Sequence, residues 1–194
     1  MHMPRYFRSV CRPNRWLRLA VLGAVWGGIQ LLPAALLVPL SIEQMAGQAQ
    51  LVVRGKVLDR SCDRDSAGRI YTRIELEVFE VWKGTPAGPR LAIVHGGGQI
   101  GNRSVKVAGQ VDYPVGQEVV AFLVLNSRGQ AVTLGLAQGK FEVWTDRPSG
   151  RQRARNPFHG QAPPGPDRIA TATATAAVEL TLDELKKRVQ GGSR

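Results

Sequence analysis

Two side chains in the middle of the chain, Cys62 and His95, have the chemistry for nucleophilic catalysis. A thiolate attacks a carbonyl carbon when an imidazole takes its proton and a third group orients that imidazole. No such third group stands at a recognisable spacing from either residue, and the other histidines, His2 and His159, fall outside the predicted strands. We therefore expect His95 to be a surface or edge residue at a strand end. We expect Cys62 to be a partly exposed thiol in a loop.

An acidic turn beginning at Asp63 has the first part of a calcium-loop pattern. That loop needs oxygen ligands at its fifth and twelfth positions, which are Ala67 and Ile74 in this chain. The H-E-x-x-H pattern of zinc proteases is absent, and one cysteine with one histidine cannot form a structural zinc site. The sequence predicts a polar turn at this place and no metal site.

The glycines at 96–98, and those that precede Lys140, suggest a phosphate-binding loop. Such a loop requires its lysine to be followed by serine or threonine. Lys140 is instead followed by Phe141 in a strand-like pattern, so we expect these glycines to serve turns and sheet corners. The sequence therefore predicts no catalytic residue, no cofactor-binding residue and no cofactor. The protein is not expected to be an enzyme.

Tyr71 and Arg73 stand together on the polar face of a predicted strand. Small β-barrels bind oligonucleotides by stacking bases on aromatic side chains beside a basic groove. Phe79 and Phe141 instead fall at core-like positions. Packing is the better interpretation of the aromatic residues, and nucleic acid is not the expected partner.

Short strands must position these side chains. Residues 70–82 alternate with period two between one dry and one wet face. Residues 51–58 are rich in β-branched side chains, and Gly55 among them predicts a bulge or a bend. Residues 118–125 form a nearly continuous apolar run, which is typical of a buried central strand. Further strands are predicted at residues 91–94, 105–107, 131–136 and 140–144.

Two helices flank the predicted strands. Ser41 with Gln44, and Thr181 with Glu184, have the spacing of a capping box at a helix start. The second helix is expected to dock on the strands or, alternatively, to bind a partner. Its apolar face holds Leu182, Leu185 and Val189. The expected fold is mainly β: a small antiparallel, OB-like β-barrel with one short N-terminal helix and a C-terminal helix.

The start of the chain predicts export. Five arginines and no acid precede an apolar run of 22 positions, residues 19–40. That order is typical of a signal peptide or of an N-terminal anchor, and both interpretations stay open because Gln30 and two prolines interrupt a long run. The working domain is expected to be periplasmic, secreted or tethered to the outer face of the inner membrane.

The formal net charge of +11 is spread unevenly along the chain. Residues 1–40 carry +5, residues 41–145 carry +2 and residues 146–194 carry +4. The nearly balanced middle block lacks the electrostatic footprint of a polyanion-binding domain. Outside the targeting segment Cys62 is the only cysteine, so no internal disulfide is expected. The predicted parts are a signal or anchor (1–40), a β-barrel domain (41–145), a disordered linker rich in Pro, Arg, Ala and Thr (146–177), and a short C-terminal helix (178–190).

Several short motifs carry a family resemblance. They lie at residues 51–57, 68–72, 81–84 and 134–141. Their order resembles a group of uncharacterised exported bacterial proteins with a small, OB-like β-barrel, some of which occur with secreted matrixin-type metalloproteases. The resemblance covers residues 41–145 and implies an accessory role near proteolysis. The barrel is also distantly similar to netrin and tissue-inhibitor modules, although this chain lacks their N-terminal cysteine framework.

We therefore expect an exported, non-enzymatic β-barrel that binds a protein or a component of the cell envelope. Three alternatives stay open: an accessory or inhibitor-like partner of a secreted protease, a hydrolase with an irregular site, and an oligonucleotide-binding barrel. Membrane contact is expected only through residues 19–40, if that segment is retained.

Overall fold

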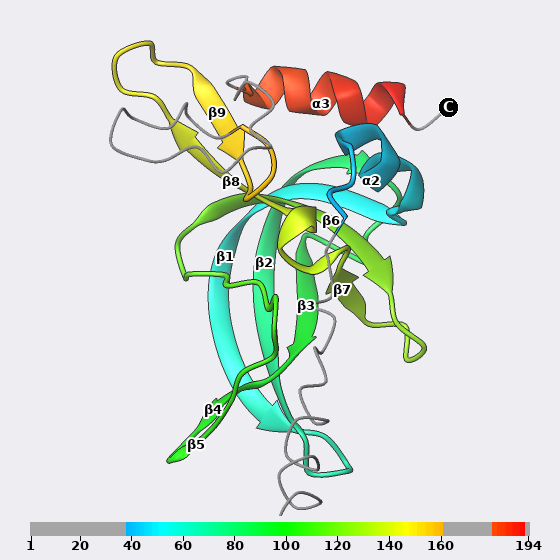
Figure 1. Ribbon diagram of the computed structural model, residues 1–194, viewed down its shortest axis with the longest axis vertical. Coiled ribbons are helices and arrows are strands. Elements are labelled where there is room, and N and C mark those ends of the chain that lie inside the picture. The colour runs from blue at the N-terminus through cyan, green and yellow to red at the C-terminus, as the bar shows by residue number, and fades with distance from the viewer. Residues whose placement is uncertain (1–37, 161–179, 193–194) are drawn as a thin grey trace, which may run out of the picture. The chain divides into compact units, whose positions relative to one another are not determined.

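The computed structural model describes residues 38–160 and 180–192, and it confirms a mainly β architecture with two helices (Figure 1). The helices are α2 (Ile42–Gln48) and α3 (Leu182–Gly191), and η1 (Leu136–Gly139) is a 3-10 helix. The strands are β1 (Leu51–Arg64), β2 (Ile70–Lys83), β3 (Arg90–Gly96), β4 (Gly98–Ile100), β5 (Arg103–Val105), β6 (Glu118–Leu125), β7 (Ala131–Thr133), β8 (Lys140–Thr145) and β9 (Gln152–Arg155).

The predicted signal or anchor lies outside the described residues, except for positions 38–40. Within the part of the chain that the structure describes, no helix combines the length and the apolar character needed to cross a bilayer. The described residues, from Val38 onward, belong to one compact unit.

The main sheet of the described residues has seven strands, and its pairings return to their starting strand. Strand β1 pairs antiparallel with β2, and β2 pairs antiparallel with β3. Strand β3 meets β7 in parallel at Ile93 and Ala131, and β7 pairs with β6. Strand β6 then pairs with β1 between Leu51 and Lys56. Strands β8 and β9 extend the sheet from β6, while β4 and β5 form a separate hairpin.

Strand β1 is longer than its apolar pattern indicates. The sequence predicts a strand that ends at Leu58 and a polar turn over residues 59–68. In the structure β1 continues to Arg64, which is paired with Ile70 of β2. The predicted start of the turn is therefore wrong. Polar residues form this part of the strand because β2 supplies backbone partners, and a pattern of apolar side chains does not report that pairing.

The bulge predicted at Gly55 is confirmed. The register between β1 and β2 shifts between Arg54 and Gly55. A Cβ atom at Gly55 would lie 2.2 Å from the backbone oxygen of Glu77. The two strands approach so closely at the bulge that only glycine fits there.

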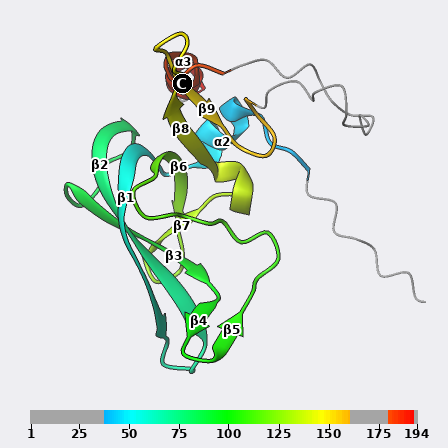
Figure 2. The ribbon, with the colours of Figure 1, turned by 90° about the vertical axis from the view of Figure 1, so that its left-hand side faces the viewer.

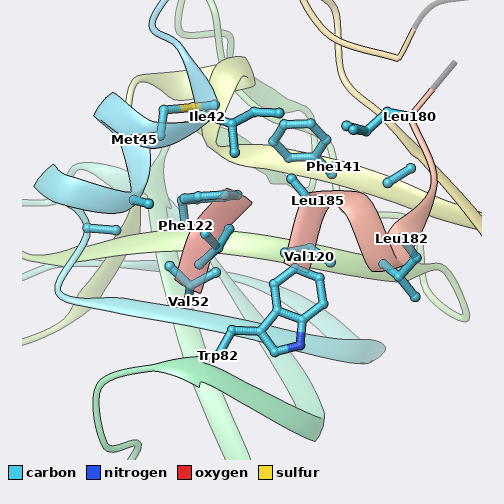
Figure 3. Close-up of a cluster of buried hydrophobic side chains, with 14 of the residues drawn as sticks. Ile42, Met45, Val52, Trp82, Val120, Phe122, Phe141, Leu180, Leu182 and Leu185 are labelled. Atoms are coloured by element: carbon cyan, nitrogen blue, oxygen red, sulfur yellow. The ribbon is translucent and has the colours of Figure 1, made fainter. Parts of the chain in front are cut away.

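Strand β6 lies between two apolar cores. Val119, Ala121 and Leu123 belong to the first core, which β1, β2 and β3 share. Val120 and Phe122 belong to the second, which we name the helix-covered core because α2 and α3 close it together with β8 (Figure 3). Burial on both faces explains the continuous apolar run of this strand and confirms its prediction as a central strand.

Both helices begin with a side-chain cap. The hydroxyl of Ser41 accepts the N–H of Gln44, whose side chain accepts the N–H of Ser41, so the predicted capping box at α2 is confirmed. The hydroxyl of Thr181 accepts the N–H of Glu184 at the start of α3. Helix α3 docks on the rest of the fold. Its buried side chains are Leu182, Leu185 and Val189.

The sheet continues into the segment expected as a linker, residues 146–177. Strand β9 pairs with β8 there, and its outer edge donates a backbone N–H to the carbonyl of Leu180. His159, also expected in the linker, stacks on Phe141 with 6.0 Å between ring centroids. The predicted domain end therefore comes too early in the chain. Residues 161–177 lie outside the described residues.

Three smaller predictions were wrong. The strand expected over 131–136 ends at Thr133, because Leu136 has a left-handed backbone with φ of 58° and η1 begins there. The strand expected over 105–107 begins two residues earlier, as β5. Phe79 is 48% exposed and not part of the core, because it falls on the wet face of the alternating strand β2.

Candidate functional site

An open cavity of about 1100 Å³ lies where three turns meet the end of β3. Its walls come from residues 64–70 between β1 and β2, residues 102–107 around β5, and residues 126–132 between β6 and β7. Residues 94–97 form the remaining side. The β1–β2 turn and the β4–β5 hairpin lie at the end of the sheet away from α2 and α3 (Figures 1 and 2).

Four arginines line this cavity, which we name the arginine cavity: Arg64, Arg69, Arg103 and Arg128. Among the described residues, Asp65 is the one acidic side chain that lines it. Asp65 lies 2.7 Å from a guanidinium nitrogen of Arg69 and 3.9 Å from one of Arg128. The hydrogen bond from Arg69 lowers the pKa of Asp65, so this carboxylate stays charged. The excess of positive charge attracts anions to the cavity.

Between the arginines the cavity wall is mixed, with serine, asparagine and glutamine residues beside apolar ones and the ring of Tyr71. Tyr71, Val105, Val107 and Val132 all line the cavity. Of the pair singled out in the sequence, Tyr71 therefore reaches the site and Arg73 does not line it. Apolar walls with a few charged groups are the usual composition of a ligand site.

His95 is half-buried at the end of β3, which agrees with the expected edge position. Burial lowers the pKa of this imidazole, and it outweighs the hydrogen bond to the backbone of Gly96, which acts in the opposite direction. Its Nδ1 lies 3.0 Å from the carbonyl oxygen of Gly96. A neutral imidazole held by its neighbouring backbone is a wall of the cavity and adds no positive charge to it.

Cys62 lies on β1 and not in a loop, which corrects the sequence expectation. Its Sγ is 3.4 Å from Oγ1 of Thr72, and this hydrogen bond lowers the pKa of the thiol. The strand register places Thr72 between Cys62 and His95. Two strand spacings separate the outer residues, a backbone distance of about 10 Å. The structure therefore does not bring Cys62 and His95 together as a nucleophile and its base.

In the acidic turn, a carboxylate oxygen accepts hydrogen bonds from backbone N–H groups of the same turn. One carboxylate oxygen of Asp65 accepts the backbone N–H groups of Ala67 and Arg69, at 3.0 and 2.9 Å. This is the polar turn that the sequence predicts. Within residues 38–160 and 180–192, no three His, Cys, Asp or Glu side chains are grouped in a way that could hold a metal ion.

Sequence reasoning missed a buried lysine. Lys140 is 7% exposed, and its Nζ donates to the backbone oxygen of Asp112 and to Oε1 of Gln117, at 2.6 Å each. The ammonium also lies 5.2 Å from the centre of the Tyr113 ring, and burial lowers its pKa. Lys140 borders a second cavity of about 450 Å³. Because its ammonium is already bonded to protein groups, its role is to hold residues 112–117 against β8.

Sequence reasoning also missed the cluster of arginines. Averaging the charge over residues 41–145 gives +2 and hides their grouping. A weak signal exists in the sequence. Arg69, Arg103 and Arg128 each adjoin a glycine or an asparagine, residue types that are common in turns. Only the fold shows that these turns meet.

Comparison with known proteins adds no relative to this description. No protein-family model matches the chain, and no curated protein matches it. Function is therefore inferred from the cavity, its charges and the strand edge beside it.

Proposed function

We propose that the chain is an exported, non-enzymatic, OB-like β-barrel that binds a protein or an envelope component through the arginine cavity. The observation that carries the proposal is the cavity itself, with about 1100 Å³ of volume and four arginines around one acid. Its volume is slightly above the usual upper limit of about 1,000 Å³ for ligand sites, and its positive charge is denser than the average over the domain.

The order of the pairings supports an OB-like barrel. The strands follow one another as β1-β2-β3-β7-β6, β6 pairs again with β1, and β3 meets β7 in parallel. OB folds bind their ligands on the second and third strands and at two turns, between strands one and two and between strands four and five. The equivalent turns of this chain, residues 64–70 and 126–132, both line the arginine cavity.

The chemistry of the neighbouring residues favours binding over catalysis. His95 is set apart from Cys62 by Thr72, and the ammonium of Lys140 is bonded to protein oxygens. Guanidinium groups hold carboxylates and phosphates by paired hydrogen bonds, and they remain charged at every physiological pH. Such a set recognises an anionic partner and performs no proton transfer.

Export is part of the proposal and rests on the five arginines that precede the apolar run 19–40. Protease added outside spheroplasts of the source organism tests it. An exported chain is cut while a cytoplasmic control protein stays intact. A chain that is protected as well as the control would contradict export.

The binding proposal is tested with the full chain, tagged at its C-terminus and crosslinked in cells of the source organism. We compare the wild type with the double variant Arg103→Glu and Arg128→Glu. Arg147→Glu is the matched control, because Arg147 is exposed in the β8–β9 turn and does not line the cavity.

We expect the wild type and Arg147→Glu to recover the same envelope partner in equal amounts. The double variant should recover it at least about tenfold less, because two attractive charges become repulsive. Circular dichroism of the purified variants shows that each is folded. Equal recovery with all three chains would show that the partner binds elsewhere.

A further inference from the structure

We infer that the arginine cavity takes an extended acidic peptide, which adds a strand to the edge of β3 at residues 94–96. This inference rests on the proposed binding function and names the class of partner. Two independent features support it: a strand edge that is only half paired, and arginines beside it that outnumber the neighbouring carboxylates.

The edge of β3 is open where it borders the cavity. Strand β2 pairs with β3 up to Gly96, whereas β7 meets β3 only at Ile93. Among the described residues, no strand pairs with this edge of β3 beyond the bridge to Ala131, and residues 94–96 all line the cavity. The N–H of Gly97 donates to the carbonyl of Ile70 in β2. Because successive residues of a strand direct their backbone groups to opposite sides, Gly96 directs its N–H toward the cavity.

An unpaired strand edge is a specific binding surface for polypeptide. It presents N–H and C=O groups at the spacing of another extended chain, and a peptide that pairs with it gains main-chain hydrogen bonds. Side chains of the peptide then alternate between the two faces of the sheet. Sugars and nucleotides lack this repeating pattern of donors and acceptors.

The charge of the cavity selects acidic side chains on that peptide. Asp65 neutralises part of the charge of Arg69 and Arg128. Among the described residues, neither Arg64 nor Arg103 has a carboxylate within 4.0 Å. Carboxylates of an incoming peptide would accept charge-assisted hydrogen bonds from these two guanidinium groups.

Two other occupants fit less well. The chain's own residues 161–179 hold two acids and one arginine, so they have little negative charge to offer. Single-stranded nucleic acid needs a row of aromatic side chains on which bases stack. Among the residues that line the cavity, Tyr71 is the one member of the group Phe, Trp and Tyr.

The test uses a fluorescent eight-residue peptide of alternating glutamate and valine, with the purified full chain and binding measured by anisotropy. A peptide with lysine in place of glutamate controls for charge. Two N-methylated peptides control for strand pairing: one blocks the N–H groups of one edge, and the other blocks those of the opposite edge. The alternating pattern fixes the register, since a slip of one residue exchanges the two faces.

We expect the acidic peptide to bind and the lysine peptide not to bind. Methylation of one edge should weaken binding at least about tenfold and methylation of the other edge by less than about twofold. Arg103→Glu should weaken it at least about tenfold, and Arg147→Glu should leave it unchanged. On binding, the backbone N–H of Gly96 should exchange with solvent more slowly.

Other outcomes overturn the inference in distinguishable ways. Equal binding of both methylated peptides would show a purely ionic contact without strand pairing. Tighter binding of an oligothymidylate or an oligouronate would assign the cavity to that polyanion. If no peptide binds but the double variant still loses its cellular partner, the peptide inference fails and the proposed function stands. If the double variant keeps its partner, both fail.

Discussion

The helix-covered core and the arginine cavity differ in what they contribute to the molecule. The first is closed by two helices and contains fully buried side chains such as Phe122, Phe141 and Leu185. The second is open, is lined by four arginines and leaves the edge of β3 half paired. Apolar burial stabilises a fold, whereas clustered like charges do not. The comparison predicts that substitutions in the helix-covered core cost more stability than substitutions in the arginine cavity, whose proposed role is recognition.

The largest effect on stability is expected in the helix-covered core. Leu185 is fully buried at the centre of the contact between α3 and the rest of the fold. Leu185→Ala should lower the free energy of unfolding by about 2–5 kcal/mol, because it removes buried methyl groups and leaves a void. Unfolding in urea measures the change. The control Val132→Ala, at a half-buried position of the arginine cavity, should cost less than about 1 kcal/mol. Equal losses of unfolding free energy in both variants would contradict the expected difference between the helix-covered core and the arginine cavity.

The next effect concerns a buried hydroxyl group that is bonded to Gly97, a residue that lines the arginine cavity. Oγ1 of Thr72 is buried and donates to the backbone oxygen of Gly97 at 2.7 Å. Thr72→Val leaves that oxygen unpaired and should cost about 1–2 kcal/mol. The pKa of the Cys62 thiol should rise at the same time, because the contact between its Sγ and Oγ1 of Thr72, which lowers that pKa, is lost.

Alkylation by iodoacetamide checks this second effect. At a fixed pH just below the ordinary thiol pKa, Thr72→Val has less thiolate and should react more slowly. Thr133→Val removes a hydroxyl that bonds to Tyr113, so it loses stability as well but leaves the reactivity of Cys62 unchanged. If both variants alkylate at the wild-type rate, Thr72 does not control the thiol.

An ion network that joins α3 to the sheet gives a smaller, pH-dependent effect. Glu80 accepts hydrogen bonds from Lys186 of α3, from Trp82 and from Arg54. These bonds, above all that of Lys186, lower the pKa of Glu80 from 4.5 to about 2. A carboxyl whose pKa is lower in the folded state contributes stability above its unfolded pKa. That stability is lost as the pH falls from about 4.5 to about 2.

Glu80→Gln should therefore lower the free energy of unfolding at pH 7 by about 1 kcal/mol, a small value because the carboxylate is partly exposed and screened. Between pH 4.5 and 2 the variant should lose less further stability than the wild type does. Glu75→Gln is the matched control on the same strand, since Glu75 pairs with Arg90 at the exposed surface. It should change stability by less than about 0.5 kcal/mol. The same pH profile in the wild type and in Glu80→Gln would show that this network does not hold α3.

The sequence predicts those parts of the fold that depend on apolar side chains. The alternation of residues 70–82, the capping box at Ser41 and the double burial of 118–125 are all confirmed. It does not predict β9, because Gln152–Arg155 has a single apolar side chain and owes its strand to backbone pairing with β8. The sequence likewise places His159 in a linker, because its contact with Phe141 joins parts of the chain that are distant in sequence.

The arginine cavity shows the same limit. Arg69, Arg103 and Arg128 stand in or beside separate turns, and their sequence neighbours say only that each is exposed. Their meeting depends on how the strands are ordered, which no local pattern reports. A charge average over a domain therefore cannot exclude a local binding site.

The smallest effect on stability is expected where the effect on binding is large. Arg103 is exposed and, among the described residues, has no carboxylate within 4.0 Å. Arg103→Glu should change the free energy of unfolding by no more than about 0.5 kcal/mol, and in the stabilising direction, because repulsion from the other cavity arginines is relieved. Urea unfolding at low salt measures it, with Arg147→Glu as the control for the change in net charge.

If Arg103→Glu is as stable as the wild type and no longer binds, Arg103 contributes to binding and not to stability. A loss above about 1 kcal/mol in Arg103→Glu but not in Arg147→Glu would mean that Arg103 holds the hairpin of β4 and β5 in place. The arginines of the cavity would then be structural, like the leucines of the helix-covered core. The absence of such a loss leaves recognition as the reason for four positive charges around one carboxylate.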